Sequence, residues 1–142
     1  MRLELTQRSD LGLQALHVIA RSPQQIVSGP EIASAINVSA PYLGTIMGPL
    51  VRAGWVRSFT GPTGGYRLTA MLSERSVLDL VEAMEGEVDR DSCMHSDPMQ
   101  EVNEPCALHD PWTRARNALL DTLAKTMLTD VLELDETTDP PI

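Results

Sequence analysis

The 142-residue chain has 42% hydrophobic and 22% charged residues and a net charge of −9, an ordinary globular composition. It contains no apolar run near the ~20 residues that a membrane span requires, and its N-terminus lacks the apolar core of a signal peptide. These features exclude a membrane protein and predict a cytoplasmic chain of one domain, with or without an appended arm. Its two cysteines are then expected to be thiols or ligands rather than a structural disulfide.

The charge is distributed unevenly along the chain. Residues 1–70 hold six arginines against three acidic residues, a net +3, whereas residues 71–142 hold five basic against seventeen acidic residues, a net −12. Arginine suits contacts with phosphates and DNA grooves, although six arginines in 70 residues are also compatible with ordinary surface charge. The asymmetry indicates two parts with different tasks.

The first half predicts three successive helices. Helical periodicity covers residues 10–20, with Ser9 as the expected N-cap. Ser28 opens a second, short helix, and Ser39 opens a third. Pro49 is expected to bend the third helix or to shift its end, because proline lacks a backbone N–H donor.

A hairpin follows the three helices. Residues 55–59 and 66–69 alternate apolar and polar side chains on either side of the turn TGPTGG. Three helices and a hairpin are the order of a winged helix-turn-helix, in which the third helix enters the DNA major groove and the hairpin reaches the adjacent backbone or minor groove. Ser39, Tyr42 and Thr45 share the leading face of the third helix and can bond phosphates or bases. The alternative is ordinary surface polarity at a helix start.

The second half predicts two helices separated by a long aperiodic stretch. Ser76 and Asp79 form a capping-box pattern at the start of one helix, and an amphipathic helix covers residues 111–127, with Asp110 as its cap. The intervening residues 86–110 are acidic and hold both cysteines. Loops of this length are usually either functional or disordered.

Several motifs together resemble the Rrf-two family of bacterial regulators, of the IscR/NsrR type, over nearly the whole chain. They are MRL at the N-terminus, SAPYLGTIMGPLVRAGWVRS, GPTGGYRL, SVLDLVEAMEGE and Cys106-x-x-His109-x-x-Trp112. The resemblance implies a mainly α fold with a small β-wing. Its expected parts are a winged helix-turn-helix domain over residues 1–85, a cluster or sensor loop over 86–110, a dimerisation helix with a short terminal turn over 111–134, and a tail over 135–142.

The resemblance also implies a homodimer that binds double-stranded DNA at a palindromic operator. Matching positions give these candidate DNA contacts: Arg2, Ser39, Tyr42, Thr45, Arg57, Ser58, Thr60, Thr63 and Gly64. Two positions depart from the family pattern. Thr60 stands where relatives often have an arginine, and Gly44 stands where IscR has a glutamate. Arg57 is expected to substitute partly for the missing arginine, and the operator sequence of relatives does not transfer.

Many family members hold an iron–sulfur cluster in the loop before the last long helix. Here Cys93 matches the first cysteine of that loop, Cys106 the third and His109 the histidine, but the middle cysteine is missing. Asp10 is a further candidate ligand, since a subset of the family uses an acidic residue of the first helix, and it can come from the partner chain. His17, on the same helix, is expected to be a packed core histidine.

Three interpretations of the cysteine stretch remain open at this point. A 2Fe–2S cluster with mixed ligands is favoured because thiolate and imidazole both suit it. Zinc is the second, because cysteine, histidine and carboxylates are all zinc ligands. The third is a loop without a cofactor, whose thiols are inert or form a redox disulfide.

The predicted function is a sequence-specific DNA-binding transcriptional regulator, a repressor, tuned by a cluster that senses redox state, nitric oxide or iron–sulfur status. An enzyme is not expected, because the chain has no nucleophile–base motif, P-loop or dinucleotide fingerprint. Two alternatives are a regulator of the same fold that responds through thiols or zinc, and a non-DNA interaction module whose acidic half binds a protein or stores metal. Steep salt dependence of DNA binding would distinguish a DNA-binding regulator from the non-DNA interaction module.

Overall fold

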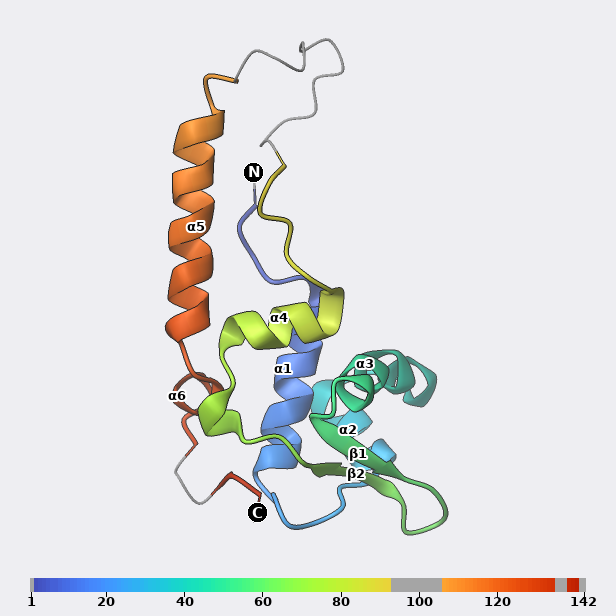
Figure 1. Cartoon of the computed structure of the whole chain (residues 1–142). Coiled ribbons are helices and arrows are strands. Elements are labelled where there is room, and N and C mark those ends of the chain that lie inside the picture. Colours follow the sequence, from blue (N-terminus) through green and yellow to red (C-terminus); the bar gives the residue numbers. More distant parts are fainter. Residues whose placement is uncertain (1, 93–105, 135–137, 141–142) are drawn as a thin grey trace.

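A computed structural model of the chain describes residues 2–92, 106–134 and 138–140 (Figure 1). In order, the elements are α1 (Gln7–Ala20), α2 (Gly29–Ile36), α3 (Ala40–Arg52), β1 (Val56–Phe59), β2 (Gly65–Leu68), the 3-10 turn η1 (Leu72–Glu74), α4 (Val77–Glu85), α5 (His109–Lys125) and α6 (Leu128–Val131). The predicted mainly α fold with a two-stranded wing is confirmed. Within the described ranges, no helix is long and apolar enough to cross a bilayer.

Helix α1 forms the centre of the core, where its buried face, including Leu16 and Ile19, packs against α2, α3, α4 and β2. It begins earlier than predicted. Thr6 is the N-cap, because its Oγ1 accepts the Ser9 N–H at 3.2 Å, so the prediction of a Ser9 cap is wrong. Ser9 lies inside the helix and is fully buried, and its hydroxyl donates to Glu85 Oε2 at 2.8 Å. The first turn of α1 is polar, so it shows no apolar periodicity from which the earlier start of the helix could have been predicted.

The turn between α2 and α3 sets the orientation of α3. The predicted caps are confirmed: the Oγ of Ser28 and the Oγ of Ser39 each accept a backbone N–H of the following first turn at 3.3 Å. Asn37 ends α2 in the left-handed region, at φ 58° and ψ 50°, which allows a tight change of direction. Helix α3 continues through the buried Pro49 to its last turn, and Gly54 follows at φ 77°.

The wing is an antiparallel hairpin in which Val56 pairs with Leu68, within one residue of the predicted ends. Both of these side chains are buried, so one face of the hairpin packs on the helices. Val27, just before α2, pairs with Tyr66 through two backbone hydrogen bonds of 2.8 Å. This bridge attaches the wing directly to the helix-turn-helix.

The predicted capping box of α4 is confirmed, with Ser76 and Asp79 exchanging hydrogen bonds at 3.0 and 2.8 Å. Helix α5 begins at His109, so the predicted Asp110 cap is wrong. Leu108 takes the N-cap position, and its side chain has no acceptor for the orphan N–H groups. Figure 1 shows α5 extending away from the other helices.

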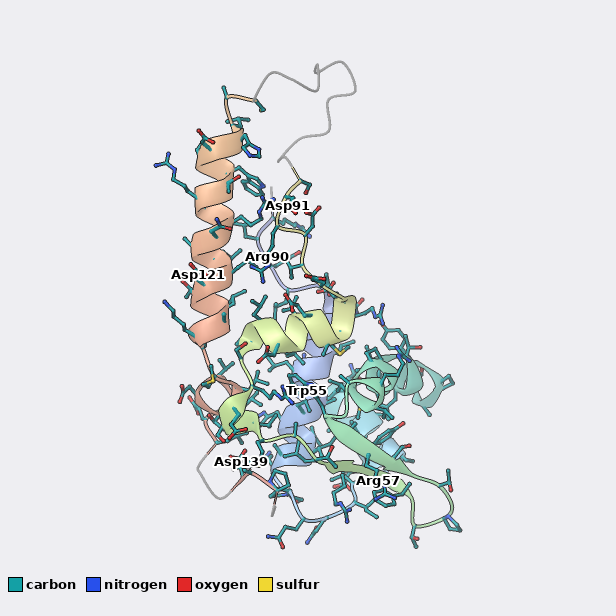
Figure 2. The ribbon with its side chains drawn as sticks, viewed as in Figure 1. Trp55, Arg57, Arg90, Asp91, Asp121 and Asp139 are labelled. Carbon is teal, nitrogen blue, oxygen red and sulfur yellow. The ribbon has the colours of Figure 1, made fainter. Side chains whose placement is uncertain are left out.

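The end of the chain returns to the core. The bridge between Ser76 and Met127 joins the end of α5 to the start of α4, and Leu128 and Leu132 are buried beyond it. Further on, the Asp139 carboxylate accepts the Ser73 backbone N–H at 3.2 Å and also the Ser73 hydroxyl (Figure 2). Helix α5 is therefore anchored at its C-terminal end while its N-terminal end projects.

Candidate nucleic-acid interface and the cysteine segment

The leading face of α3 is open to solvent. Ser39 and Thr45 are exposed and Tyr42 is half-buried, while the opposite face places Ile46 and Leu50 in the core. Ser39 Oγ binds the Tyr42 N–H, which leaves other N–H groups of the first turn available. The positive end of the helix dipole therefore coincides with three side chains that donate and accept hydrogen bonds. This arrangement suits a phosphate or a base edge.

The wing turn brings small and polar residues to a tip near α3. Thr60 and Thr63 are exposed, and the Gly64 N–H donates to the Gly61 carbonyl at 3.0 Å, which closes the turn. A Cβ on Gly64 would lie 2.2 Å from the Phe59 carbonyl oxygen, so the close turn requires glycine. In Figure 1 the tip of the wing and the start of α3 project on the same side of the molecule, away from α5.

The outward face of the wing carries Arg57, Phe59 and Arg67. Both guanidinium carbons lie over the Phe59 ring, each 5.1 Å from its centroid. Figure 2 places Arg57 on the wing, on the far side of the molecule from Asp121 of α5. Ser58 lies between Arg57 and Phe59 on β1 and is exposed.

Two further basic residues near this surface were not predicted as site residues. Arg67 faces Arg57 directly across the hairpin; both lie within the predicted strands, but the register that pairs them was not predicted. Arg52 is exposed seven residues after Thr45, and the side chain folds back so that Nη1 lies 3.2 Å from a Cβ placed on Gly48. The 3.6-residue repeat puts Arg52 on the same helix face as Thr45.

Arg2 lies apart from α3 and the wing in a single chain. It is exposed, and its Nη1 is 3.4 Å from Glu4 Oε1 in an exposed ion pair. The N-terminal segment runs beside α5, where Leu3 and Leu5 line a shallow groove with Leu119 and Leu123. The structure therefore does not bring Arg2 together with the other candidate DNA contacts of the same chain.

Two of the candidate cluster ligands lie at the start of α5. Cys106 is half-buried, and its Sγ accepts the Leu108 N–H at 3.4 Å. Its carbonyl oxygen accepts the N–H of His109, the first residue of the helix, at 2.9 Å. An N–H donor and a nearby helix N-terminus both favour the thiolate form of a cysteine. Cys93 lies outside the described residues.

Asp10 is exposed in the first turns of α1, where its Oδ2 accepts a hydrogen bond from Gln14 Nε2 at 2.8 Å. In Figure 1 the start of α1 lies beside the end of α4, whereas the start of α5, which His109 opens and Cys106 precedes, lies at the far end of that helix. Among the residues that can be described, no three His, Cys, Asp or Glu side chains gather as metal ligands. His17 is exposed, so its predicted place in the core is wrong.

The chain leading into the cysteine segment is tied to both α4 and α5. Arg116 of α5 donates to the Ser92 carbonyl oxygen at 2.6 Å and also to that of Arg90, while Arg90 pairs with Glu82 at 3.5 Å. Hydrogen bonds from the Ser92 hydroxyl and from backbone N–H groups lower the pKa of Asp89 from 3.8 to about 2. The ionised Asp89 therefore holds the turn that Arg116 contacts, through hydrogen bonds from the Asp91 and Ser92 N–H groups.

Comparison with known proteins decides the family. The model of the Rrf2 (Rrf-two) family, described as an iron-dependent transcriptional regulator, matches residues 5–134. This chain belongs to the Rrf2 family. It is 30% identical over 131 residues to protein rrf2 of Nitratidesulfovibrio vulgaris, covering 92% of this chain and 87% of that protein. It is 27% identical over 135 residues to the transcriptional regulator IscR of Vibrio campbellii, covering 94% and 80%.

The structure of CymR, the global cysteine regulator of Bacillus subtilis, superposes on this Rrf2-family chain with a TM-score of 0.74. The two are 27% identical, and the match covers 93% of this chain and 98% of CymR. The predicted family and winged-helix fold are thus confirmed. The chain is a DNA-binding transcriptional regulator of the helix-turn-helix type, and its relatives are regulators rather than enzymes.

Proposed function

We propose that this Rrf2-family protein is a homodimeric, sequence-specific repressor that reads DNA with α3 and the wing and is tuned through its cysteine segment. The observation that carries the DNA-binding part is the exposed start of α3. It combines a helix N-terminus with Ser39, Tyr42 and Thr45 on one open face, next to a wing that projects on the same side. Phosphate contacts position such a helix, and side-chain contacts with base edges specify the sequence.

The experiment that tests this part is selection of bound duplexes from a randomised DNA pool by the full-length protein. We expect enrichment of palindromic sequences, and we expect the logarithm of the binding constant to fall linearly with the logarithm of salt concentration. If no duplex is enriched and none binds at low salt, the regulator proposal fails. The non-DNA interaction module, supported by the net charge of −12 over residues 71–142, would then replace it.

The dimer is proposed from the apolar surface of α5. Of its 17 residues only Leu120 is buried, while Leu119 is 47% exposed and Leu108, just before the helix, is also 47% exposed. A helix that leaves large apolar side chains uncovered is expected to bury them against a partner. A second copy fits this requirement, because two-fold pairing would also present two α3 helices to a palindrome.

Replacement of Leu119 with glutamate is expected to convert the dimer to a monomer and to weaken operator binding at least tenfold. The half-exposed side chain tolerates a charge in one chain, but burial of that charge in a dimer would be costly. Analytical ultracentrifugation and operator titration measure the two effects. Asp121→Asn is the matched control, since a residue two positions on lies about 200° around the helix. A dimeric Leu119→Glu variant would overturn the proposed interface.

For the cysteine segment we propose a 2Fe–2S cluster with mixed ligands. Cys93, Cys106 and His109 would hold it, and Asp10 of the partner subunit would complete the set, since Asp10 does not approach α5 within one chain. Thiolates and imidazole both ligate such clusters, and the N–H donated to Cys106 Sγ suits a metal-bound sulfur. When bound, the cluster would supply a redox- or nitric oxide-sensitive centre.

The half-buried Cys106 lies just before α5 and so connects the cysteine segment directly to the proposed dimer helix. Arg116 holds the carbonyl oxygens that precede the segment, and Cys106 ends it one turn before His109. A change in the conformation of the cysteine segment would therefore shift α5, and the shift of α5 would change the spacing of the two α3 helices in the dimer. A tenfold change in affinity needs only ~1.4 kcal/mol between the two states.

Replacement of Cys106 with serine is expected to remove the visible absorption, iron and acid-labile sulfide of anaerobically purified protein. It is also expected to abolish any difference in operator affinity between loaded and cluster-free protein. His17→Ala, which changes an exposed histidine on α1, is the control and should keep the cluster. Colourless wild-type protein that contains zinc would favour the zinc alternative. Protein without any metal would leave a thiol-responsive or unresponsive regulator.

A further inference from the structure

The outward face of the wing contains an arrangement that its fold does not require. Arg57 and Arg67 are paired directly opposite each other across the hairpin, and Phe59 lies two residues along on the same face. Each guanidinium carbon lies 5.1 Å from the centroid of the Phe59 ring. We call these three residues the wing triad.

Like charges placed directly opposite in a β-hairpin destabilise it. Within the described ranges, neither Arg57 nor Arg67 has a carboxylate within 4 Å, although the chain as a whole carries a net charge of −9. The negative face of the Phe59 ring offsets part of the repulsion. The ring is not a strong hydrogen-bond acceptor, however, so it does not satisfy the N–H donors of the two guanidinium groups. Two adjacent cations thus keep their donors available at a position where mutual repulsion costs stability.

We propose that the wing triad is a phosphate-binding element, in which Arg57 and Arg67 contact the DNA backbone and Phe59 is the positioning residue that holds both guanidinium groups. An approaching phosphate would remove the repulsion between the two cations and accept paired hydrogen bonds from their planar donors. The ring contact restricts both flexible side chains before binding, so less side-chain entropy is lost on association. This inference rests on the proposed DNA-binding function.

The test uses a duplex selected by the wild-type protein and measures its affinity over a range of salt concentrations. Arg57→Ala and Arg67→Ala are each expected to reduce the slope of log K against log salt by about 1.8, that is about 0.9 for each of the two wings of the dimer, and to weaken binding at least tenfold at 0.1 M salt. Arg75→Ala is the matched control. It removes an arginine that lies between η1 and α4, outside both strands of the wing, with its guanidinium carbon 5.7 Å from the Trp55 ring centroid, and should leave the slope unchanged.

The role of Phe59 is tested by replacing its ring. Phe59→Leu is expected to weaken binding about two- to fivefold while keeping the number of released ions, because both charges remain. Phe59→Tyr, which keeps an aromatic face, is expected to bind DNA with wild-type affinity. A purely structural role would instead lower thermal stability and affinity together in both variants.

The outcomes separate this inference from the proposed function. Unchanged affinity and salt slope in both arginine variants would overturn the phosphate-binding triad, whereas DNA binding that still depends on Thr45 would leave the function intact. Equal affinities of Phe59→Leu and wild-type protein would overturn the positioning role. If wild-type protein binds no duplex at all, the function and the inference fail together.

Discussion

Replacement of Gly65 with alanine is expected to lower the free energy of unfolding by about 3 kcal/mol and to detach the wing from the helices. A Cβ on Gly65 would lie 2.1 Å from the carbonyl oxygen of Val27, and the residue has φ 152°, a conformation that alanine rarely adopts. The obstacle is backbone rather than a flexible side chain. Relief would therefore break the two 2.8 Å hydrogen bonds that join Val27 to Tyr66. Urea unfolding followed by circular dichroism measures the loss.

Gly54→Ala separates backbone conformation from steric contact. Gly54 also has a positive φ, 77°, but a Cβ there would meet nothing within 4 Å, so we expect a loss of only about 1 kcal/mol. Gly44→Ala, in the open face of α3, should stabilise the protein by roughly 0.5–1 kcal/mol, because alanine favours a helix over glycine. A Gly65→Ala loss no larger than that of Gly54→Ala would contradict the proposed close approach.

Replacement of Thr45 with alanine is expected to weaken operator binding between about tenfold and a hundredfold while leaving the fold slightly more stable. Thr45 is exposed on the leading face of α3, so its hydroxyl and methyl are free for a base or phosphate contact worth about 1–3 kcal/mol. Alanine is the better helix former at an exposed position. Binding and stability should thus move in opposite directions. Fluorescence anisotropy with the selected duplex and thermal unfolding measure the two quantities.

Thr122→Ala provides the same chemical change on another exposed helix. Its Oγ1 donates to the Ala118 carbonyl oxygen within α5, so it has no expected role at the DNA surface. Because Thr122 lies three residues from Leu119, its affinity is compared at protein concentrations where analytical ultracentrifugation shows a dimer. Operator affinity should stay within twofold of wild type. If Thr45→Ala instead binds as tightly as wild type on selected and unselected duplexes, the leading face of α3 does not read the operator.

The sequence predicted the elements wherever a local rule decides the outcome. Ser28, Ser39 and the Ser76–Asp79 pair cap their helices as expected, because a side chain satisfies the orphan N–H groups a few residues along. The change from a helical to an alternating repeat located the hairpin within one residue at each end. These local signals, with the family motifs, were enough for the fold class and for the open face of α3.

Predictions were wrong where a polar residue could fill two roles. Ser9 reads equally well as a cap and as a buried helical residue, and only the proximity of Glu85, 76 residues away in sequence, decides between them. His17 was expected in an apolar helix face, but neighbouring elements leave that side of α1 open to solvent. Asp110 has the chemistry of a cap, yet the turn formed by Cys106 starts α5 earlier.

The order of the helices and the wing, the family and the residue types offered to DNA or to a metal could all be predicted from the amino-acid sequence, because they depend on spacing along the chain. Which residues distant in sequence come into contact could be read only from the folded chain. The fold joined Arg57, Phe59 and Arg67 on one face of the wing, and it separated Asp10 from the start of α5. Such meetings depend on strand register and helix packing across the core, which no local pattern encodes.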